Sequence, residues 1–317
     1  MKPLFSIKLC FTVIVAIFFF SACQKPAKEN QGHELKKDSR LIQVNGTELY
    51  AFTMGTGEPL LVIHGGPGMS HGYFLPHLES LTDKYQLIFY DHRASGQSSY
   101  DVDSSSMTMR NFVEDIEGLR KHFGLEKMNI MGHSWGGLLA MWYAGTYPEN
   151  LKSMILVNTI GASREFTAAA MANLNGRTSA EHYHISDSLT NTPGFLAGDS
   201  LALLQAFKFS FGITFYDPSD LDKLNLSLSS DRMERQAKLQ FLFPDLVNYD
   251  LHEGLTWVTC PTLLIHGDYD ANPLDAVKKI DEYLPNSELV VIPNCGHWAF
   301  IEAPDIFEET VENFLAR

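Results

Sequence analysis

The stretch Gly132-His133-Ser134-Trp135-Gly136 follows the apolar run 128–131 and opens a helix-like segment over 137–147. A serine at a sharp strand-to-helix turn is held in a strained backbone geometry that lifts its hydroxyl clear of the sheet. Flanking glycines let neighbouring elements pass close to it. Ordinary tight turns also contain this five-residue pattern, so the residues that follow along the chain must decide. On this basis Ser134 is the first candidate nucleophile.

Two polar loops follow Ser134, each after a short buried strand. Residues 262–266 are typical of a strand that leads into Asp270, and residues 288–292 of one that leads into His297. Upstream, a predicted strand over 59–63 ends in the glycine-rich loop His64-Gly65-Gly66-Pro67-Gly68, whose amides can turn toward a developing negative charge. The order serine, acid, histidine favours acyl-transfer chemistry.

Each of these residues has an expected role. Ser134 would attack a carbonyl carbon, His297 would take and later deliver the proton, and Asp270 would fix the imidazole tautomer. Asp268 is the alternative acid, because it lies in the same loop. The backbone amides of Gly66 and Trp135 are the expected oxyanion donors.

Composition limits the possible partners and cofactors. The chain has 317 residues, 45% of them hydrophobic and 20% charged, which suits one large core with an insertion. A formal net charge of −14 argues against binding to a phosphate backbone, so we expect no nucleic-acid partner. No Cys/His cluster has the spacing of zinc ligands, so we expect no metal, and we expect no other cofactor.

The N-terminal segment predicts export. Lys2 and Lys8 precede the apolar run 9–20, which is too short to cross a bilayer as a stable helix. The following Phe20-Ser21-Ala22-Cys23 resembles a bacterial lipobox, which implies lipidation of Cys23 and anchoring at the cell envelope. The alternative is a plain secretory signal cleaved near Ala22.

Residues 1–22 are thus expected to be a lipoprotein-type signal peptide, and the polar residues 23–39 a flexible tether. Of the thiols outside the signal, Cys260 precedes one predicted strand and Cys295 follows another. If those strands are parallel neighbours, about 20 Å of strand separates the thiols, whereas a disulfide tolerates a Cα separation of about 7 Å. We therefore expect both thiols to be free and buried.

The order of predicted elements indicates a parallel sheet interrupted by a helical insertion. Asn45-Gly46 joins two strands, 40–44 and 48–53, in a predicted hairpin. Strands and helices then alternate, which favours a parallel sheet. The expected elements are the strands 59–63, 86–90, 128–131, 151–158, 262–266 and 288–292 and the helices 73–81, 109–123, 137–147, 273–283 and 304–315. Residues 161–255 lack buried-strand runs and predict a helical cap, which leaves 40–160 and 256–317 as the core.

With these motifs the chain resembles the α/β-hydrolase superfamily, and most of all the proline iminopeptidases. The resemblance rests on four segments: 64–68, Asp91-His92-Arg93-Ala94-Ser95-Gly96-Gln97-Ser98, 132–137 and 138–148. It implies a mostly parallel eight-stranded sheet with helices on both faces and a helical cap before the acid strand. It also implies release of an N-terminal residue, often proline, from short peptides, with a free amine bound by the cap.

Two positions depart from that family's pattern. Ala94 stands where glycine usually follows the arginine, and Ala271 stands where some members have a glutamate. An aminopeptidase needs a buried carboxylate for the bound ammonium. The cap candidates for this role are Glu165, Glu181, Asp217, Glu234 and Glu253.

Other interpretations remain open at this point. Asp91 and Arg93 are expected to be structural and to form a hydrogen-bonded pair that holds the active-site loop. An esterase or another small-molecule acyl hydrolase would use the same three residues, because the cap selects the substrate. A ligand-binding protein on a hydrolase frame is the third hypothesis.

Overall fold

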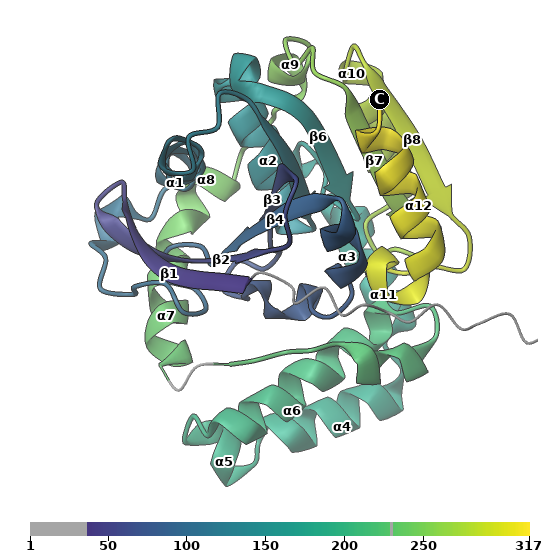
Figure 1. The fold of residues 1–317 in the computed structure, drawn as a ribbon. Coiled ribbons are helices and arrows are strands. Elements are labelled where there is room, and N and C mark those ends of the chain that lie inside the picture. Colours follow the sequence, from purple (N-terminus) through teal and green to yellow (C-terminus); the bar gives the residue numbers. More distant parts are fainter. Residues whose placement is uncertain (1–36, 229–230) are drawn as a thin grey trace, which may run out of the picture. The chain divides into compact units, whose positions relative to one another are not determined.

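The computed structural model describes residues 37–228 and 231–317 (Figure 1). The signal peptide over 1–22, the lipidation site Cys23 and most of the expected tether lie outside these residues. The first strand begins at Lys37, so the last three residues of the expected tether belong to the sheet. Within the described ranges, no helix combines the length and the apolar character needed to cross a membrane.

Eight strands of the described residues form one sheet in the order β1-β2-β4-β3-β5-β6-β7-β8. β1 pairs with β2 and β2 with β4 in antiparallel fashion, whereas all later pairs are parallel. The predicted mostly parallel eight-stranded sheet is confirmed. The strands are β1 (Lys37–Val44), β2 (Thr47–Met54), β3 (Glu58–Ile63), β4 (Tyr85–Tyr90), β5 (Met128–His133), β6 (Leu151–Val157), β7 (Thr262–Gly267) and β8 (Ser287–Ile292).

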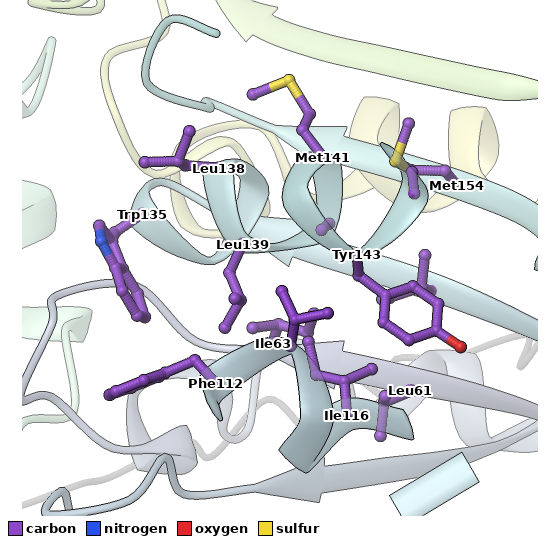
Figure 2. Close-up of a cluster of buried hydrophobic side chains, with 14 of the residues drawn as sticks. Leu61, Ile63, Phe112, Ile116, Trp135, Leu138, Leu139, Met141, Tyr143 and Met154 are labelled. Carbon is purple, nitrogen blue, oxygen red and sulfur yellow. The ribbon is translucent and has the colours of Figure 1, made fainter. Parts of the chain in front are cut away.

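Helices cover both faces of the sheet because alternate strand residues point to opposite sides. On β3, Leu61 and Ile63 join a core with α1 (Met109–His122), α2 (Trp135–Thr146) and α10 (Leu274–Tyr283). Leu60 and Val62 join a second core on the other face, with α11 (Ala299–Glu302) and α12 (Pro304–Leu315). Figure 2 shows the first core, where side chains of α1 and α2 meet those of β3. The central strands are thus buried on both sides.

The residues between β6 and β7 are helical. Helices α4 and α6 lie side by side in this segment (Figure 1). The helices here are α3 (Thr167–Arg177), α4 (Ala180–Thr190), α5 (Pro193–Leu196), α6 (Ser200–Phe211), α7 (Arg232–Leu239), α8 (Phe243–Leu246) and α9 (His252–Leu255). The 3₁₀ turns here are η5 (Arg164–Phe166), η6 (Gly212–Thr214), η7 (Pro218–Lys223) and η8 (Gln240–Leu242).

One predicted helix is wrong. Residues 73–81 form two short 3₁₀ turns, η1 (His71–Phe74) and η2 (Glu79–Asp83), rather than a helix. Pro76 lies between them and has no backbone N–H to donate, so a continuous helix is interrupted there. The remaining 3₁₀ turns are η3 (Ser104–Ser106) and η4 (Pro148–Asn150).

The positions of the two thiols agree with the predicted strand order. Cys260 precedes β7 and Cys295 follows β8, and these two strands are parallel neighbours. Both cysteines are free and buried, which confirms the prediction. Burial raises the pKa of the Cys260 thiol to about 11.

Candidate active site

Ser134 lies at the junction of β5 and α2 in a backbone conformation that side-chain-bearing residues rarely adopt. Its φ is 59° and its ψ is −122°. The turn is fixed from the neighbouring strand, because the Ser134 amide donates to the Val157 carbonyl oxygen at 3.0 Å. The serine therefore stands at the carboxyl end of a central strand, at the N-terminus of a helix.

The glycines around Ser134 are required by close backbone approaches. A Cβ on Gly132 would lie 2.3 Å from the Gly136 carbonyl oxygen, and a Cβ on Gly136 would lie 2.4 Å from the Ile63 carbonyl oxygen. Both separations are shorter than any van der Waals contact allows. The two glycines of the Gly-X-Ser-X-Gly pattern therefore allow β3, β5 and α2 to pack closely at this turn.

Asp270 and His297 form a hydrogen-bonded pair beside this turn. The His297 Nδ1 atom lies 2.9 Å from Asp270 Oδ2 and 3.1 Å from Oδ1. Asp270 is buried, and its carboxylate also accepts from the Asn158 side-chain amide and from the Asn272 backbone amide, both at 2.9 Å. The alternative acid, Asp268, instead accepts from the Cys295 amide at 3.4 Å. The structure therefore brings Asp270, rather than Asp268, into contact with His297.

The electrostatics of the pair match its geometry. Burial opposes ionisation of Asp270, but the charge and hydrogen bond of His297 outweigh it and lower the pKa of Asp270 well below its usual range. Burial likewise opposes protonation of His297, yet the Asp270 carboxylate raises the pKa of His297 above its ordinary value. The pair therefore stabilises the imidazolium form that proton transfer would create.

A cavity of about 340 Å³ contains both Ser134 and His297. The glycine loop after β3 forms one wall and approaches the serine closely, since a Cβ on Gly65 would lie 3.0 Å from the Ser134 Cβ. Gly66 lines the cavity, whereas the Trp135 side chain is buried in the core beside α1. The lining residues are Gly65, Gly66, Pro67, Met69, His133, Ser134, Phe207, Phe211, Arg232, Gln236, His297 and Trp298.

His133 connects three parts of the site. Its Nδ1 lies 2.9 Å from the Tyr73 hydroxyl, and its Nε2 lies 2.9 Å from the His297 carbonyl oxygen. The Tyr73 hydroxyl also accepts from the Gly65 amide at 2.5 Å. Burial lowers the pKa of His133 to about 3, so the ring is neutral at neutral pH. This chain of hydrogen bonds joins the histidine loop to the glycine loop.

Sequence reasoning missed two residues that hold the site together. Asn158 donates to both Asp270 and the Gly296 carbonyl oxygen, each at 2.9 Å. Glu302 accepts from three backbone amides, at distances of 2.7, 2.9 and 3.0 Å. Asn158 directly follows β6, and this position at the carboxyl end of a strand next to β7 is a signal that could have identified it.

The expected pairing of Asp91 with Arg93 is wrong. Arg93 is buried and points to α1, where it binds Asp115 with two hydrogen bonds of 2.6 and 2.7 Å. Asp91 accepts from the backbone amides of His71 and Gln97, both at 2.8 Å. Both residues lie in the loop after β4, where Asp91 is bound by backbone amides and Arg93 by a carboxylate of α1.

The five cap carboxylates are exposed, and none is among the cavity's described lining residues. Glu165 forms an ion pair with Lys279, and Asp217 accepts from the Ser219 amide at the start of η7. The remaining three are Glu181, Glu234 and Glu253. Over the described ranges, no group of three or more His, Cys, Asp or Glu side chains is arranged to hold a metal ion.

The amino-acid sequence is similar to those of known peptidases. The chain is 27% identical over 293 residues to a proline iminopeptidase from Saccharolobus solfataricus, which covers 90% of this chain and 94% of that protein. It is 29% identical over 279 residues to a proline iminopeptidase from Lactobacillus delbrueckii subsp. bulgaricus, with coverage of 81% and 89%.

A solved structure with a similar fold is also that of a proline iminopeptidase. The crystal structure of a proline iminopeptidase from Mycobacterium smegmatis superposes with a TM-score of 0.68 at 24% identity, and covers 88% of this chain and 98% of that one. Residues 58–304 match the family described by the alpha/beta hydrolase fold. The chain therefore belongs to the α/β-hydrolase fold family of hydrolytic enzymes.

Proposed function

We propose that the protein is a serine hydrolase that releases an N-terminal residue from short peptides through an acyl-enzyme on Ser134. The observation that carries this proposal is one cavity that contains Ser134 and His297, with His297 bound to the buried Asp270. The similarity to proline iminopeptidases over at least 81% of the chain supports a peptide substrate.

The geometry supports a defined sequence of proton transfers. Because His297 Nδ1 is bound to Asp270, the opposite nitrogen, Nε2, is left to accept the Ser134 proton as the hydroxyl attacks the carbonyl carbon. His297 then delivers this proton to the leaving amine. Water hydrolyses the acyl-enzyme with the same histidine as the base. The amides of Gly66 and Trp135 would donate to the oxyanion, and removal of one such donor typically costs about 3 kcal/mol of transition-state stabilisation.

The test compares free and blocked amines. Purified full-length protein is assayed on prolyl, alanyl and N-blocked prolyl anilides, with Ser134→Ala as the blank. Cleavage of the free prolyl anilide but not of the N-blocked form supports an aminopeptidase. Cleavage of simple esters without cleavage of any anilide would retain the serine mechanism and reject the peptidase activity.

An esterase or other small-molecule acyl hydrolase is the second candidate. It is favoured by the composition of the cavity, whose described lining includes Met69, Phe207, Phe211 and Trp298 but no carboxylate that would bind an ammonium. Turnover of p-nitrophenyl esters at a kcat/KM far above that of prolyl anilide would favour this candidate.

We also propose that the protein is exported and anchored by a lipid on Cys23, which lies outside the described residues. The lysine-flanked apolar run 9–20 and the Phe20-Ser21-Ala22-Cys23 ending support this proposal. Metabolic labelling with an alkyne fatty acid should mark the wild-type protein but not a Cys23→Ser variant. Equal labelling of both, or a wild-type protein that stays in the soluble fraction, would contradict it.

A further inference from the structure

Arg232 is a basic residue in a cavity whose described walls hold no acid. It occupies the first turn of α7 and lines the same cavity as Ser134 and His297. Besides Ser134 and His297, the lining includes the polar side chains of Gln236 and His133. The His133 ring is already bound to the Tyr73 hydroxyl and the His297 carbonyl oxygen. Arg232 is therefore the one Lys or Arg side chain among the cavity's described lining residues.

The Arg232 guanidinium makes few hydrogen bonds to the described residues of the protein. The Arg232 Cζ atom lies 3.8 Å from the centre of the Phe207 ring, and Nη1 donates weakly to the Gly68 carbonyl oxygen at 3.4 Å. Among the described residues no carboxylate forms an ion pair with it, and burial is the only influence that lowers its pKa. A guanidinium carries five N–H donors, and the bond to Gly68 is the one hydrogen bond that Arg232 donates among the described residues. A partly buried cation with free donors favours an anionic ligand.

The neighbouring basic residues on α7 serve a different purpose. Arg235 is matched by Asp231 through hydrogen bonds of 2.8 and 2.9 Å, and it also donates to the Ser98 carbonyl oxygen at 2.7 Å. Lys238 donates to the Val102 carbonyl oxygen at 2.9 Å. These contacts fix one face of α7 against the loop after β4. The face that carries Arg232, and Gln236 one turn later, is thereby turned toward the cavity.

The Arg232 guanidinium lies over the ring of Phe207, a residue of α6 that also lines the cavity. Phe207 and Phe211 are four residues apart on α6, so they lie on one face of that helix, and both line the cavity. A guanidinium stacked on an aromatic ring keeps its N–H groups free in the plane of the fork. The ring therefore holds Arg232 in place without using the donors that a ligand needs.

We propose that Arg232 binds a carboxylate carried by the substrate, so that the enzyme prefers anionic substrates. This inference rests on the proposed function, because it takes Ser134 as the reacting centre. A single guanidinium matches the single charge of a carboxylate and binds it in bidentate fashion. In a short peptide this group is the free C-terminus of the leaving group, whereas in an ester substrate it is a carboxylate on the acyl chain.

Two matched substrate pairs locate the carboxylate. Prolylglycine and prolylglycinamide differ only in the charge of the leaving group, and mono-p-nitrophenyl glutarate and p-nitrophenyl butyrate differ in the charge of the acyl group. Each is assayed on the full-length wild-type protein, on Arg232→Gln and on Lys208→Gln, a variant that loses the same charge from the neighbouring helix α6 outside the cavity.

The expected result is a wild-type preference for the carboxylate member of at least one pair, about 10- to 100-fold in kcat/KM. Arg232→Gln lowers kcat/KM for the carboxylate member at least about 10-fold more than for the neutral member, so the preference is lost, whereas Lys208→Gln keeps it. A wild-type enzyme without preference in either pair, or a preference that survives Arg232→Gln, overturns the proposal.

A binding measurement separates this proposal from the proposed function. Calorimetric titration of Ser134→Ala with prolylglycine and prolylglycinamide, and with glutarate as a free carboxylate, needs no turnover. The anion site is supported, even if no peptide is cleaved, when Ser134→Ala binds the carboxylates and the double variant Ser134→Ala/Arg232→Gln binds them about 10-fold or more weakly. Cleavage of prolyl substrates without any dependence on the carboxylate supports the proposed function and rejects the anion site.

Discussion

Glu302→Gln is the substitution whose effect follows most directly from the contacts around His297. Glu302 Oε2 accepts from the amides of Gly296 (2.9 Å) and Tyr216 (2.7 Å), and Oε1 accepts from the amide of Trp298 (3.0 Å). Two of these amides flank His297 in the chain. The carboxylate therefore holds both ends of the histidine loop.

The cost of the substitution can be worked out from these three bonds. Glutamine has one acceptor oxygen, so its best orientation keeps the bonds to Gly296 and Tyr216 and turns an NH₂ group toward the Trp298 N–H. One buried donor left without an acceptor costs about 1–3 kcal/mol. The two remaining bonds lose their charge assistance, which roughly halves their strength. The expected loss of stability is about 2–4 kcal/mol, or a fall in Tm of roughly 5–10 °C.

The pH profile gives a second readout that loss of stability alone would not move. Burial opposes protonation of His297, whereas the charges of Asp270 and Glu302 raise the pKa of His297 and the Arg177 guanidinium lowers it. Only the neutral imidazole can act as the base, so activity is lost as pH falls through this pKa. Removal of the Glu302 charge lowers the pKa of His297, and the acid limb of kcat/KM should move to lower pH.

The assay pairs thermal unfolding with a pH profile of kcat/KM on the best neutral substrate. Glu309→Gln is the control, because Glu309 is exposed on α12 and the variant loses the same charge. The reasoning is refuted if the acid limb of Glu302→Gln coincides with that of the wild type, or if its Tm falls no further than that of Glu309→Gln.

Three further substitutions test the site and its frame. Asp270→Asn should lower kcat by about 10⁴-fold because the imidazole is held in the wrong tautomer, whereas Asp268→Asn should change kcat by less than about 10-fold; equal losses would contradict the assignment of the acid. Gly132→Ala should abolish the native fold or cost more than about 4 kcal/mol in urea unfolding, since its Cβ would lie 2.3 Å from a carbonyl oxygen, and a wild-type midpoint would contradict that clash. Arg93→Met should cost about 3–5 kcal/mol by leaving the Asp115 carboxylate buried without its partner, and Arg93→Met/Asp115→Leu should recover part of this loss; a single variant as stable as the wild type would show that the pair contributes nothing.

The sheet and the positions of the polar loops could be predicted because they depend on local patterns. Buried strands leave apolar runs, and Asn45-Gly46 and the glycines around Ser134 mark turns that few other residues can form. The helix expected over 73–81 failed for a local reason as well, since Pro76 interrupts the hydrogen-bond pattern of a helix.

Partners that are distant in sequence could not be predicted in the same way. The sequence suggests that Arg93 is structural, but its partner Asp115 lies 22 residues away on a helix whose rotation about its axis depends on packing. Glu302 reaches Tyr216, 86 residues away, through a turn in the cap. The direction in which α7 presents Arg232 is fixed by contacts with the loop after β4, which no periodicity in α7 reveals.

The most direct measurement is active-site labelling of the full-length protein with a fluorophosphonate, followed by peptide mass spectrometry. The proposed Ser134-His297-Asp270 triad predicts one adduct per chain on the peptide that contains Ser134, no adduct in Ser134→Ala, and a labelling rate that falls strongly in Asp270→Asn. An adduct on another residue, or equal labelling of the wild type and Ser134→Ala, would contradict the serine mechanism.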